Sequence, residues 1–401
     1  MARTDVLVAG GGMAGLGAAL AVSRARPDLR LTLLEQASAF GEVGAGIQLG
    51  PNVVHVLRDW GLESDLRECA AFPERLVVRD VAGGDMLGQL ALGHRAEQRY
   101  GAPYATIHRA DLHTLLQRAV RRVASVNVTL GQQVHDLHTA SDRSIVVNGV
   151  DGHSWTAAAV LGCDGVWSRV RAVAWRDSPA RFTGHLAYRG MVPVGDLPAV
   201  LRSQQVSVWL GPRCHVVHYP VRSGAWMNVV AVVHGDLPAD GAHWNHQANG
   251  SDLLQALGAV AAPLQDLLQS VPQWRLWPLH ARPPMRNATE QAQGAVALLG
   301  DAAHPMRPYL AQGAAMALED AWVLGRDLQG TTGSVDWPAT FARWAAQRWA
   351  RNAWVQDRSR RNGVIFHARG PMRWGRNLAM AVLGERLLDV PRLYKGPASP
   401  V

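Results

Sequence analysis

A glycine-rich turn near the N-terminus constrains the fold more than any other part of the sequence. The apolar run at residues 5–9 leads into Gly-Gly-Gly-Met-Ala-Gly at 10–15, which matches G-x-G-x-x-G, and residues 14–24 predict a helix. A second strand at 30–34 closes on Glu35, 20 residues past the last glycine. In such a unit the glycines make a tight turn, admit a pyrophosphate and let the helix pack on the strand. The pattern predicts dinucleotide binding, with Glu35 accepting hydrogen bonds from an adenosine ribose. The alternative is a Gly-rich turn without a ligand.

Two further predicted strands also end in an acid. An apolar run from residue 295 ends in Gly300-Asp301, and after a loop with two prolines a helix begins at Gln312. Ligands of open α/β sheets lie outside the carboxyl ends of the strands, where a helix N-terminus offers N–H groups to an anion. Asp301 is therefore a candidate acceptor for a ribose-type hydroxyl, unless it only caps the helix. The strand at 159–162 runs into Asp164, where the alternative is a simple Asp-Gly turn.

The central part of the chain has a different pattern. Residues 40–52 hold four glycines, which favour a close approach of the backbone to a flat ligand. Arg109 opens a predicted helix and is placed for a phosphate, unless it is a surface arginine paired with Asp111. Residues 184–234 predict several strands with short turns, forming an antiparallel sheet. His215 and Tyr219 share one face of the strand at 215–219 because side chains alternate with period two.

Charge and cysteine usage narrow the class of protein. The net charge is +8, Lys395 is the only lysine, and the arginines are scattered. This favours anionic small ligands or composition bias over nucleic acid. The three cysteines form no C-x-x-C and no metal-ligand cluster, which fits a reducing compartment and predicts no metal site. No apolar stretch reaches the ~18 residues of a membrane helix, and the N-terminus leaves no room for a signal peptide. We expect a cytoplasmic protein without a membrane span.

Three segments together resemble a known family. They are the glycine motif with Glu35, Gly-Cys-Asp-Gly at 162–165 and Gly-Asp-Ala-Ala-His-Pro at 300–305. In this order and spacing they resemble the single-component FAD-dependent aromatic hydroxylases, the p-hydroxybenzoate hydroxylase-like group. Residues 41–52, 105–116 and 299–320 look closest to the 3-hydroxybenzoate 6-hydroxylase and salicylate hydroxylase branch. The resemblance covers most of the chain and weakens after about Thr331.

The resemblance implies an α/β fold, in which a Rossmann-like FAD-binding domain carries an inserted antiparallel-sheet substrate domain and C-terminal helices. The expected FAD-binding domain is discontinuous, at residues 1–70, 100–180 and 281–330. The substrate domain spans 71–99 and 181–280, and the C-terminal helical segment spans 331–401.

The resemblance also implies roles for cofactor-binding residues. It places FAD on the glycine turn, Glu35 on the adenosine ribose, Arg109 near the pyrophosphate and Asp301 on the ribityl chain. Asp164 resembles an acid that serves both FAD and the electron donor, NADH or NADPH. The full cofactor-binding set implied in this way is Gly10, Gly12, Met13, Ala14, Gly15, Glu35, Gln36, Gly46, Arg109, Val134, Asp164, Gly300, Asp301, Gly313 and Ala314.

The resemblance implies a substrate pocket as well. His215, Tyr219 and Gln312 match pocket positions of 3-hydroxybenzoate 6-hydroxylases and are the expected catalytic residues. The expected substrate-binding set is Gln48, Tyr104, His215, Tyr219, Pro308 and Gln312. The chain has Gln48 and Tyr309 where 6-hydroxynicotinate hydroxylases carry histidines, which weighs against that substrate. The alternative for His215 is a histidine whose hydrogen bonds are satisfied within the sheet.

The chemistry implied is hydroxylation of a small aromatic ring. NAD(P)H reduces FAD, O2 adds at flavin C4a, and the phenol ring attacks the distal oxygen of the hydroperoxide. His215, neutral near pH 7, would take or hydrogen-bond the phenol proton, and Tyr219 would orient the ring. The expected substrate resembles 3-hydroxybenzoate or salicylate, and the expected oligomer is a monomer or homodimer.

Other flavin chemistries remain as alternatives. These are a monooxygenase of a heteroaromatic or secondary-metabolite ring, and a flavin-binding protein without turnover. By family resemblance, a flavin halogenase would need a lysine beside the flavin, and Lys395 is the only lysine in the sequence. A disulfide reductase would need a redox cysteine pair, which the sequence lacks.

Overall fold

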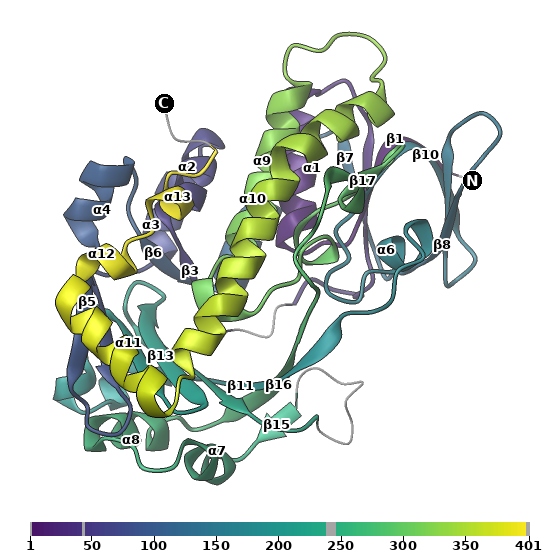
Figure 1. Ribbon diagram of the computed structural model, residues 1–401. Coiled ribbons are helices and arrows are strands. Elements are labelled where there is room, and N and C mark those ends of the chain that lie inside the picture. The colour runs from purple at the N-terminus through teal and green to yellow at the C-terminus, as the bar shows by residue number, and fades with distance from the viewer. Residues whose placement is uncertain (1, 42–44, 238–245, 398–401) are drawn as a thin grey trace. The chain divides into compact units, whose positions relative to one another are not determined.

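The computed structural model describes residues 2–41, 45–237 and 246–397 and divides the chain into two compact units (Figure 1). The first unit consists of Met1–Glu42, His113–Arg181 and His280–Arg358. The second consists of Val43–Leu112, Phe182–Leu279 and Ser359–Val401. In the described part of the chain, no helix combines the length and apolar character needed to cross a membrane.

The first unit is built on a mainly parallel sheet with strand order β17-β18-β10-β1-β2-β7. In that order the strands are Ala292–Gln293, Val296–Leu298, Ser154–Gly162, Ala2–Ala9, Leu31–Glu35 and Val126–Leu130. The strands β18 to β7 are parallel, β17 is antiparallel to β18, and β8 (Val134–Thr139) and β9 (Ile145–Gly149) extend β10 as antiparallel strands. Val6, Leu7 and Val8 are fully buried, as expected for a parallel strand covered on both faces.

Two helices pack closely against each other beside this sheet. They are α1 (Met13–Ala25) and α9 (Gly313–Leu328), which lie side by side in Figure 1. A Cβ on Gly325 would lie 3.0 Å from the carbonyl oxygen of Ala21, so glycine permits the close approach. Gly300, at φ +59°, lets the end of the strand lie close to these helices, because an added Cβ there would be only 2.9 Å from the Cβ of Ala14. Helix α10 (Trp337–Phe366) follows α9, and up to Arg358 it belongs to this unit.

The second unit contains an eight-stranded sheet with order β15-β16-β11-β14-β13-β12-β4-β5. In that order the strands are His246–Ala248, Trp274–Ala281, Arg181–Pro193, Trp226–His234, Cys214–Val221, Val206–Gly211, Arg75–Asp80 and Met86–Ala91. The strands within residues 184–234 are antiparallel to one another, as expected, and the sheet continues from β12 to β4 by a parallel pairing. The β4–β5 hairpin comes from a much earlier part of the chain, so no short turn fixes its direction relative to β12.

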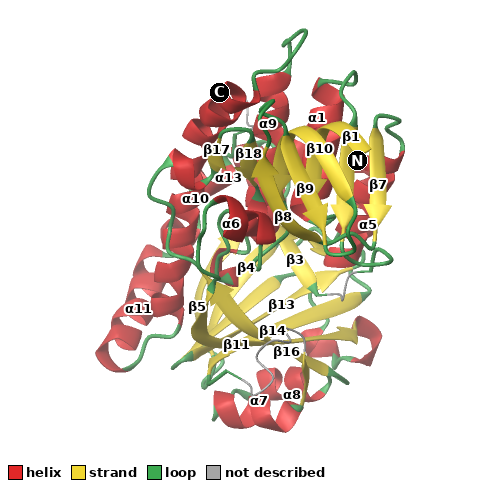
Figure 2. Ribbon diagram, turned by 90° about the vertical axis from the view of Figure 1, so that its right-hand side faces the viewer, coloured by secondary structure: helices red, strands yellow, loops and turns green. Residues whose placement is uncertain are grey.

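The two faces of this sheet differ in character. Leu186, Val216 and Val233 pack in an apolar cluster with residues of α7 (Gly250–Leu257) and α8 (Ala262–Gln269). Figure 2 shows these two helices beneath the sheet. Side chains alternate along each strand, so His215 and Tyr219 point to the opposite face. On that face the ribbon of β3 (Gly46–Leu49) and β6 (Ala105–His108) is tied to β14, since Gly46 N donates to Asn228 Oδ1 at 2.6 Å.

The remaining helices of the second unit flank these strands. They are α2 (Pro51–Asp59), α3 (Glu63–Cys69), α4 (Gly93–Tyr100), α11 (Gly370–Leu383), α12 (Glu385–Leu388) and α13 (Pro391–Tyr394). The expected domains were drawn by ligand, whereas the compact units follow chain contacts. By contacts, Val43–Leu112 belongs to the unit of the second sheet, and the C-terminal segment divides between the units at Arg358.

Candidate active site

The glycine turn of the first unit has the shape that a pyrophosphate requires. Gly10 has φ +104°, and an added Cβ would lie 2.5 Å from the carbonyl oxygen of Cys163. An added Cβ on Gly15 would lie 1.8 Å from the carbonyl oxygen of Gly10, whereas one on Gly12 would meet no atom within 4 Å. No side chain in the described ranges caps the N-terminus of α1, where Met13 and Ala14 form the first turn. The N–H groups of that turn therefore fit the phosphates of a dinucleotide.

Glu35 supports this turn from the end of β2. Its Oε2 accepts a hydrogen bond from Gly11 N at 2.7 Å, and its Oε1 accepts one from Ala37 N at 2.8 Å. Each carboxylate oxygen can accept a second bond, so these contacts orient the group and leave room for a ribose hydroxyl. The neighbouring Gln36 is exposed. His113, which sequence reasoning missed, braces the turn from α5 (Arg109–Arg121), with its Nε2 2.8 Å from the carbonyl oxygen of Gly11.

Asp164 follows β10 and holds the start of a short helix. Its Oδ1 accepts from Ser168 Oγ at 2.5 Å, and its Oδ2 accepts from the backbone N of Arg169 and Val170 at 2.7 and 3.0 Å. Burial raises the pKa of Asp164, although these hydrogen bonds partly offset the effect. These contacts are the ones expected of an aspartate that only stabilises a turn, which was the alternative for Asp164. Its expected role in cofactor reduction therefore remains a prediction. Val134, the other expected cofactor residue nearby, begins β8 and is buried.

The loop after β18 leads to the start of α9. Asp301 is exposed in a 3-10 turn at Gly300–Ala302, and Gln312 is buried next to the first residue of α9. A Cβ on Gly313 would lie 4.0 Å from Asp301 Oδ1, so the carboxylate and the helix start, which includes Ala314, are neighbours. Pro308 opens a second 3-10 turn at Pro308–Leu310. This arrangement offers an acceptor and a helix N-terminus at one place.

The expected cofactor residues of the first unit therefore gather at one edge of its sheet. The glycine turn follows β1, Glu35 ends β2, Asp164 follows β10 and Gly300 follows β18. These four strands are parallel neighbours, so their carboxyl ends share an edge. That edge is where doubly wound sheets bind nucleotides.

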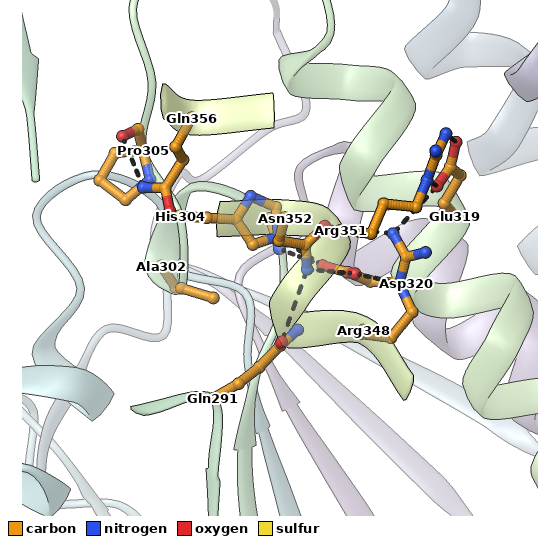
Figure 3. A network of polar contacts seen from close by, with 12 residues as sticks. Gln291, Ala302, His304, Pro305, Glu319, Asp320, Arg348, Arg351, Asn352 and Gln356 are labelled. Atoms are coloured by element: carbon orange, nitrogen blue, oxygen red, sulfur yellow. Dashed lines mark hydrogen bonds and ion pairs between the residues drawn. The ribbon is translucent and has the colours of Figure 1, made fainter. Parts of the chain in front are cut away.

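A buried network of charges anchors the loop at 300–305 (Figure 3). His304 Nε2 lies 2.6 Å from Asp320 Oδ2, and Arg348 Nε donates to Asp320 Oδ1 at 2.8 Å. Arg351 binds Glu319 through two bonds of 2.7 Å, and Arg348 reaches the same carboxylate at 3.0 Å. Burial alone would raise the pKa of Asp320, but His304 and Arg348 outweigh it and hold that pKa well below its usual range. The network thus joins the loop, α9 and α10.

Sequence reasoning missed the α10 half of this network. The signal was an acidic pair, Glu319-Asp320, in a buried helix, which needs cationic partners from elsewhere in the chain. Arg351 and Asn352 lie three and four positions after Arg348, so both lie on the same face of α10 as Arg348. That spacing alone does not tell which helix they face.

In the second unit, three expected substrate residues meet around one amide. Tyr104 Oη donates to Gln48 Oε1 at 2.5 Å, and the amide of Gln48 also lies near enough to the Tyr219 hydroxyl to lower its pKa. Burial raises the pKa of Tyr219, while Arg189 and Gln48 lower it less. A Cβ on Gly46 would lie 2.8 Å from Tyr219 Cε2, so glycine lets β3 lie against β13. We define Gln48, Tyr104 and Tyr219 as the tyrosine cluster.

His215 lies on the same strand face as Tyr219 but has its own partner. Its Nδ1 is 2.7 Å from His367 Nε2, and the side chain is buried. Burial, with a smaller effect of His185, lowers the pKa of His215 to about 3. The ring is therefore neutral from roughly pH 6 to 9, as expected, but it does not titrate there. So low a pKa makes His215 a weak base and favours a hydrogen-bonding role.

Arg189 is a further residue on this face that sequence reasoning did not single out. It lies on β11, its guanidinium carbon is 3.7 Å from the ring centre of Trp277, and its Nε has no hydrogen-bond partner. No carboxylate among the described residues forms an ion pair with it. Burial, followed by the charge of Arg109, lowers the pKa of Arg189 to about 9, although Tyr219 opposes this. A desolvated cation without a counter-ion is costly, so Arg189 fits an anionic ligand near the tyrosine cluster.

Comparison with known proteins agrees with this geometry. Residues 3–334 match the model of a family described as FAD binding domain. The chain is 37% identical to a 3-hydroxybenzoate 6-hydroxylase of Polaromonas naphthalenivorans (strain CJ2), over 94% of this chain and 91% of that protein. It is 34% identical to a 3-amino-4-hydroxybenzoate 2-monooxygenase of Streptomyces platensis, over 100% and 98%. A salicylate hydroxylase solved with substrate superposes with a TM-score of 0.82 at 25% identity, over 99% of this chain and 96% of that one.

Proposed function

The chain belongs to the FAD-dependent aromatic hydroxylases, and we propose that its substrate is a small phenolic carboxylate of the 3-hydroxybenzoate or salicylate type. FAD, reduced by NADH or NADPH, supplies the activation of O2 when it is bound. The space beside Gly12, where an added Cβ would meet no atom within 4 Å, and the uncapped N-terminus of α1 fit the pyrophosphate of FAD. Glu35 and Asp301 would hold its hydroxyl groups. The three free cysteines fit the cytoplasm as the proposed compartment.

The observation that carries the substrate class is the guanidinium of Arg189, whose Nε has no hydrogen-bond partner and which forms no ion pair with a carboxylate of the described residues. It shares the sheet face with His215 and Tyr219, because Arg189 and His185 are four positions apart on β11 and His185 is the register partner of His234. Its electrostatic interaction with Tyr219 places its charge near the tyrosine cluster. A carboxylate is the planar anion that a guanidinium binds best, through two parallel hydrogen bonds. An aromatic acid would thus supply the counter-ion that none of the described carboxylates provides.

The remaining polar groups would orient the ring. In this proposal Tyr219, with Gln48 and Tyr104 behind it, fixes the plane of the substrate. His215 exchanges a hydrogen bond with the phenol hydroxyl, so that electron density is available at the ring when oxygen is transferred. His367 holds His215 through Nδ1 and so sets the orientation of its imidazole. Gln312 and the start of α9 would stabilise negative charge on the cofactor.

The test compares an acid with a neutral analogue. NAD(P)H oxidation and hydroxylated product are measured with 3-hydroxybenzoate, salicylate and 3-hydroxybenzyl alcohol, for the parent, Arg189→Gln and the control Arg79→Gln. The guanidinium carbon of Arg79 also lies over a tryptophan ring, 5.6 Å from the ring centre of Trp209, but Arg79 is on β4. A charge-assisted bond worth about 1.5–3 kcal/mol predicts that KM for the acid rises roughly 10- to 150-fold in Arg189→Gln only. An equal change of KM for the acid and the alcohol would exclude the carboxylate contact.

A further inference from the structure

Three histidines form a cluster on the second sheet, and only His367 of the three enters the proposal above, as the partner of His215. His185 on β11 and His234 on β14 are register partners in the antiparallel pair, so their side chains project from the same face. His367 comes directly after α10 and reaches this face from the C-terminal segment. One nitrogen of each ring lies within 4.8 Å of the others. His185 and His367 are buried, and His234 is half-buried.

The chemistry of these three rings matches that of a transition-metal site. Neutral imidazole is a preferred ligand of Zn²⁺ and Cu²⁺, and three protein ligands with one open position are a common coordination set. Metal–nitrogen bonds of about 2.0–2.1 Å in a tetrahedron place the nitrogens roughly 3.3 Å apart. His234 Nε2 and His367 Nδ1 already lie 2.8 Å apart, so small side-chain rotations bring the set to that geometry.

The partner of His367 also fits this interpretation. A metal-bound histidine usually donates its second ring N–H to a neighbouring acceptor, which fixes the ring. With Nδ1 of His367 directed at the cluster, its Nε2 faces His215 Nδ1 at 2.7 Å. His215 would therefore support the site from outside the ligand set. Partial exposure of His234 provides a route for the ion.

We propose that His185, His234 and His367 bind one divalent transition-metal ion through three imidazole nitrogens, with the fourth position open to water. The ion links the end of α10 to the central strands β11 and β14. The expectation of no metal came from the cysteine spacing. The three histidines lie 49 and 133 positions apart in the sequence and come together only through the fold.

The test uses the full-length, tag-free holoprotein after removal of metals with a chelator. One equivalent of Cu²⁺ is added for electron paramagnetic resonance, and Zn²⁺ is titrated by calorimetry. The variants are His234→Gln and His185→Gln, and the control is His94→Gln, an exposed histidine on α4. We expect one ion per chain with nitrogen couplings from three imidazoles in the parent and the control. Loss of one ligand should weaken binding at least about 100-fold, more than loss of an outer-shell partner does.

Three outcomes would overturn the proposal. The first is a parent that binds no stoichiometric ion, which would leave a hydrogen-bonded imidazole chain. The second is a copper spectrum with fewer than three nitrogen couplings. The third is a His234→Gln variant that has the FAD content and circular dichroism of the parent and binds Zn²⁺ as tightly as the parent does. The first two outcomes depend on the parent alone, so a variant that fails to fold does not affect them.

Discussion

Asp320→Asn should destabilise the protein strongly, because it removes a buried charge that binds three side chains inside the first unit. The carboxylate is fully buried and contacts His304, Arg348 and Asn352 at 2.6, 2.8 and 2.9 Å. Asparagine keeps the shape but loses the charge, and Arg348 is then left buried with Glu319 as its remaining carboxylate partner. Breaking a buried ion pair on one side costs about 3–5 kcal/mol. The folded-to-unfolded ratio should therefore fall by two to nearly four orders of magnitude.

The assay is urea unfolding of the holoprotein, followed by circular dichroism in parallel with flavin fluorescence. The matched control is Asp327→Asn on the same helix, whose half-buried carboxylate accepts from Gln347 of α10 at 2.8 and 3.0 Å. The amide oxygen of asparagine still accepts from Gln347, so the loss is the difference between a charge-assisted and a neutral hydrogen bond, about 1 kcal/mol. If Asp320→Asn shifts the free energy of unfolding no more than Asp327→Asn does, the buried network does not anchor the loop as argued.

Three further predictions concern cofactor binding, cofactor reduction and acid stability. Glu35→Ala should weaken FAD binding roughly 10- to 150-fold, the equivalent of one charge-assisted hydrogen bond; flavin fluorescence titration checks this, and unchanged affinity would remove Glu35 from the ribose. Asp164→Ala should keep FAD but slow its reduction by NAD(P)H in stopped-flow traces, and an unchanged rate would leave Asp164 as a helix cap. Burial, with a smaller effect of Arg79, lowers the pKa of His218 to about 4. The unfolded chain therefore binds an extra proton between roughly pH 6.5 and 4. Lowering the pH through this range decreases the free energy of unfolding by up to about 1.4 kcal/mol per pH unit. His218→Phe should flatten that slope in unfolding experiments between those pH values, and an equal slope would contradict the assignment.

Local patterns predicted the nucleotide half of the fold. The glycine turn, the helix after it and Glu35 are encoded within a short stretch. The rule that ligands sit at the carboxyl ends of parallel strands then placed Asp164 and Asp301 on the same edge. The structure has these strands as parallel neighbours. Each of these inferences needed only the residues next to the motif.

What the sequence did not predict depends on contacts between distant segments. Arg348 of α10 binds Asp320 of α9, and His367, which follows α10, contacts His234 of β14. The parallel pairing of β12 with β4 also joins segments that no short turn connects. Arg189 was one arginine among many in the sequence, and only burial without a counter-ion distinguishes it. The low pKa of His215 likewise follows from its buried position, which period-two alternation alone cannot supply.

The origin of the oxygen in the product tests the central claim most directly. The holoprotein is supplied with NADH or NADPH, 3-hydroxybenzoate or salicylate, and ¹⁸O2 gas, and the product is analysed by mass spectrometry alongside NAD(P)H consumption. A monooxygenase of aromatic acids should place one ¹⁸O atom on the ring for each NAD(P)H consumed, and His215→Ala should divert part of that consumption to hydrogen peroxide. Consumption of NAD(P)H that yields only peroxide in the parent, or a hydroxyl group without ¹⁸O, would contradict the account.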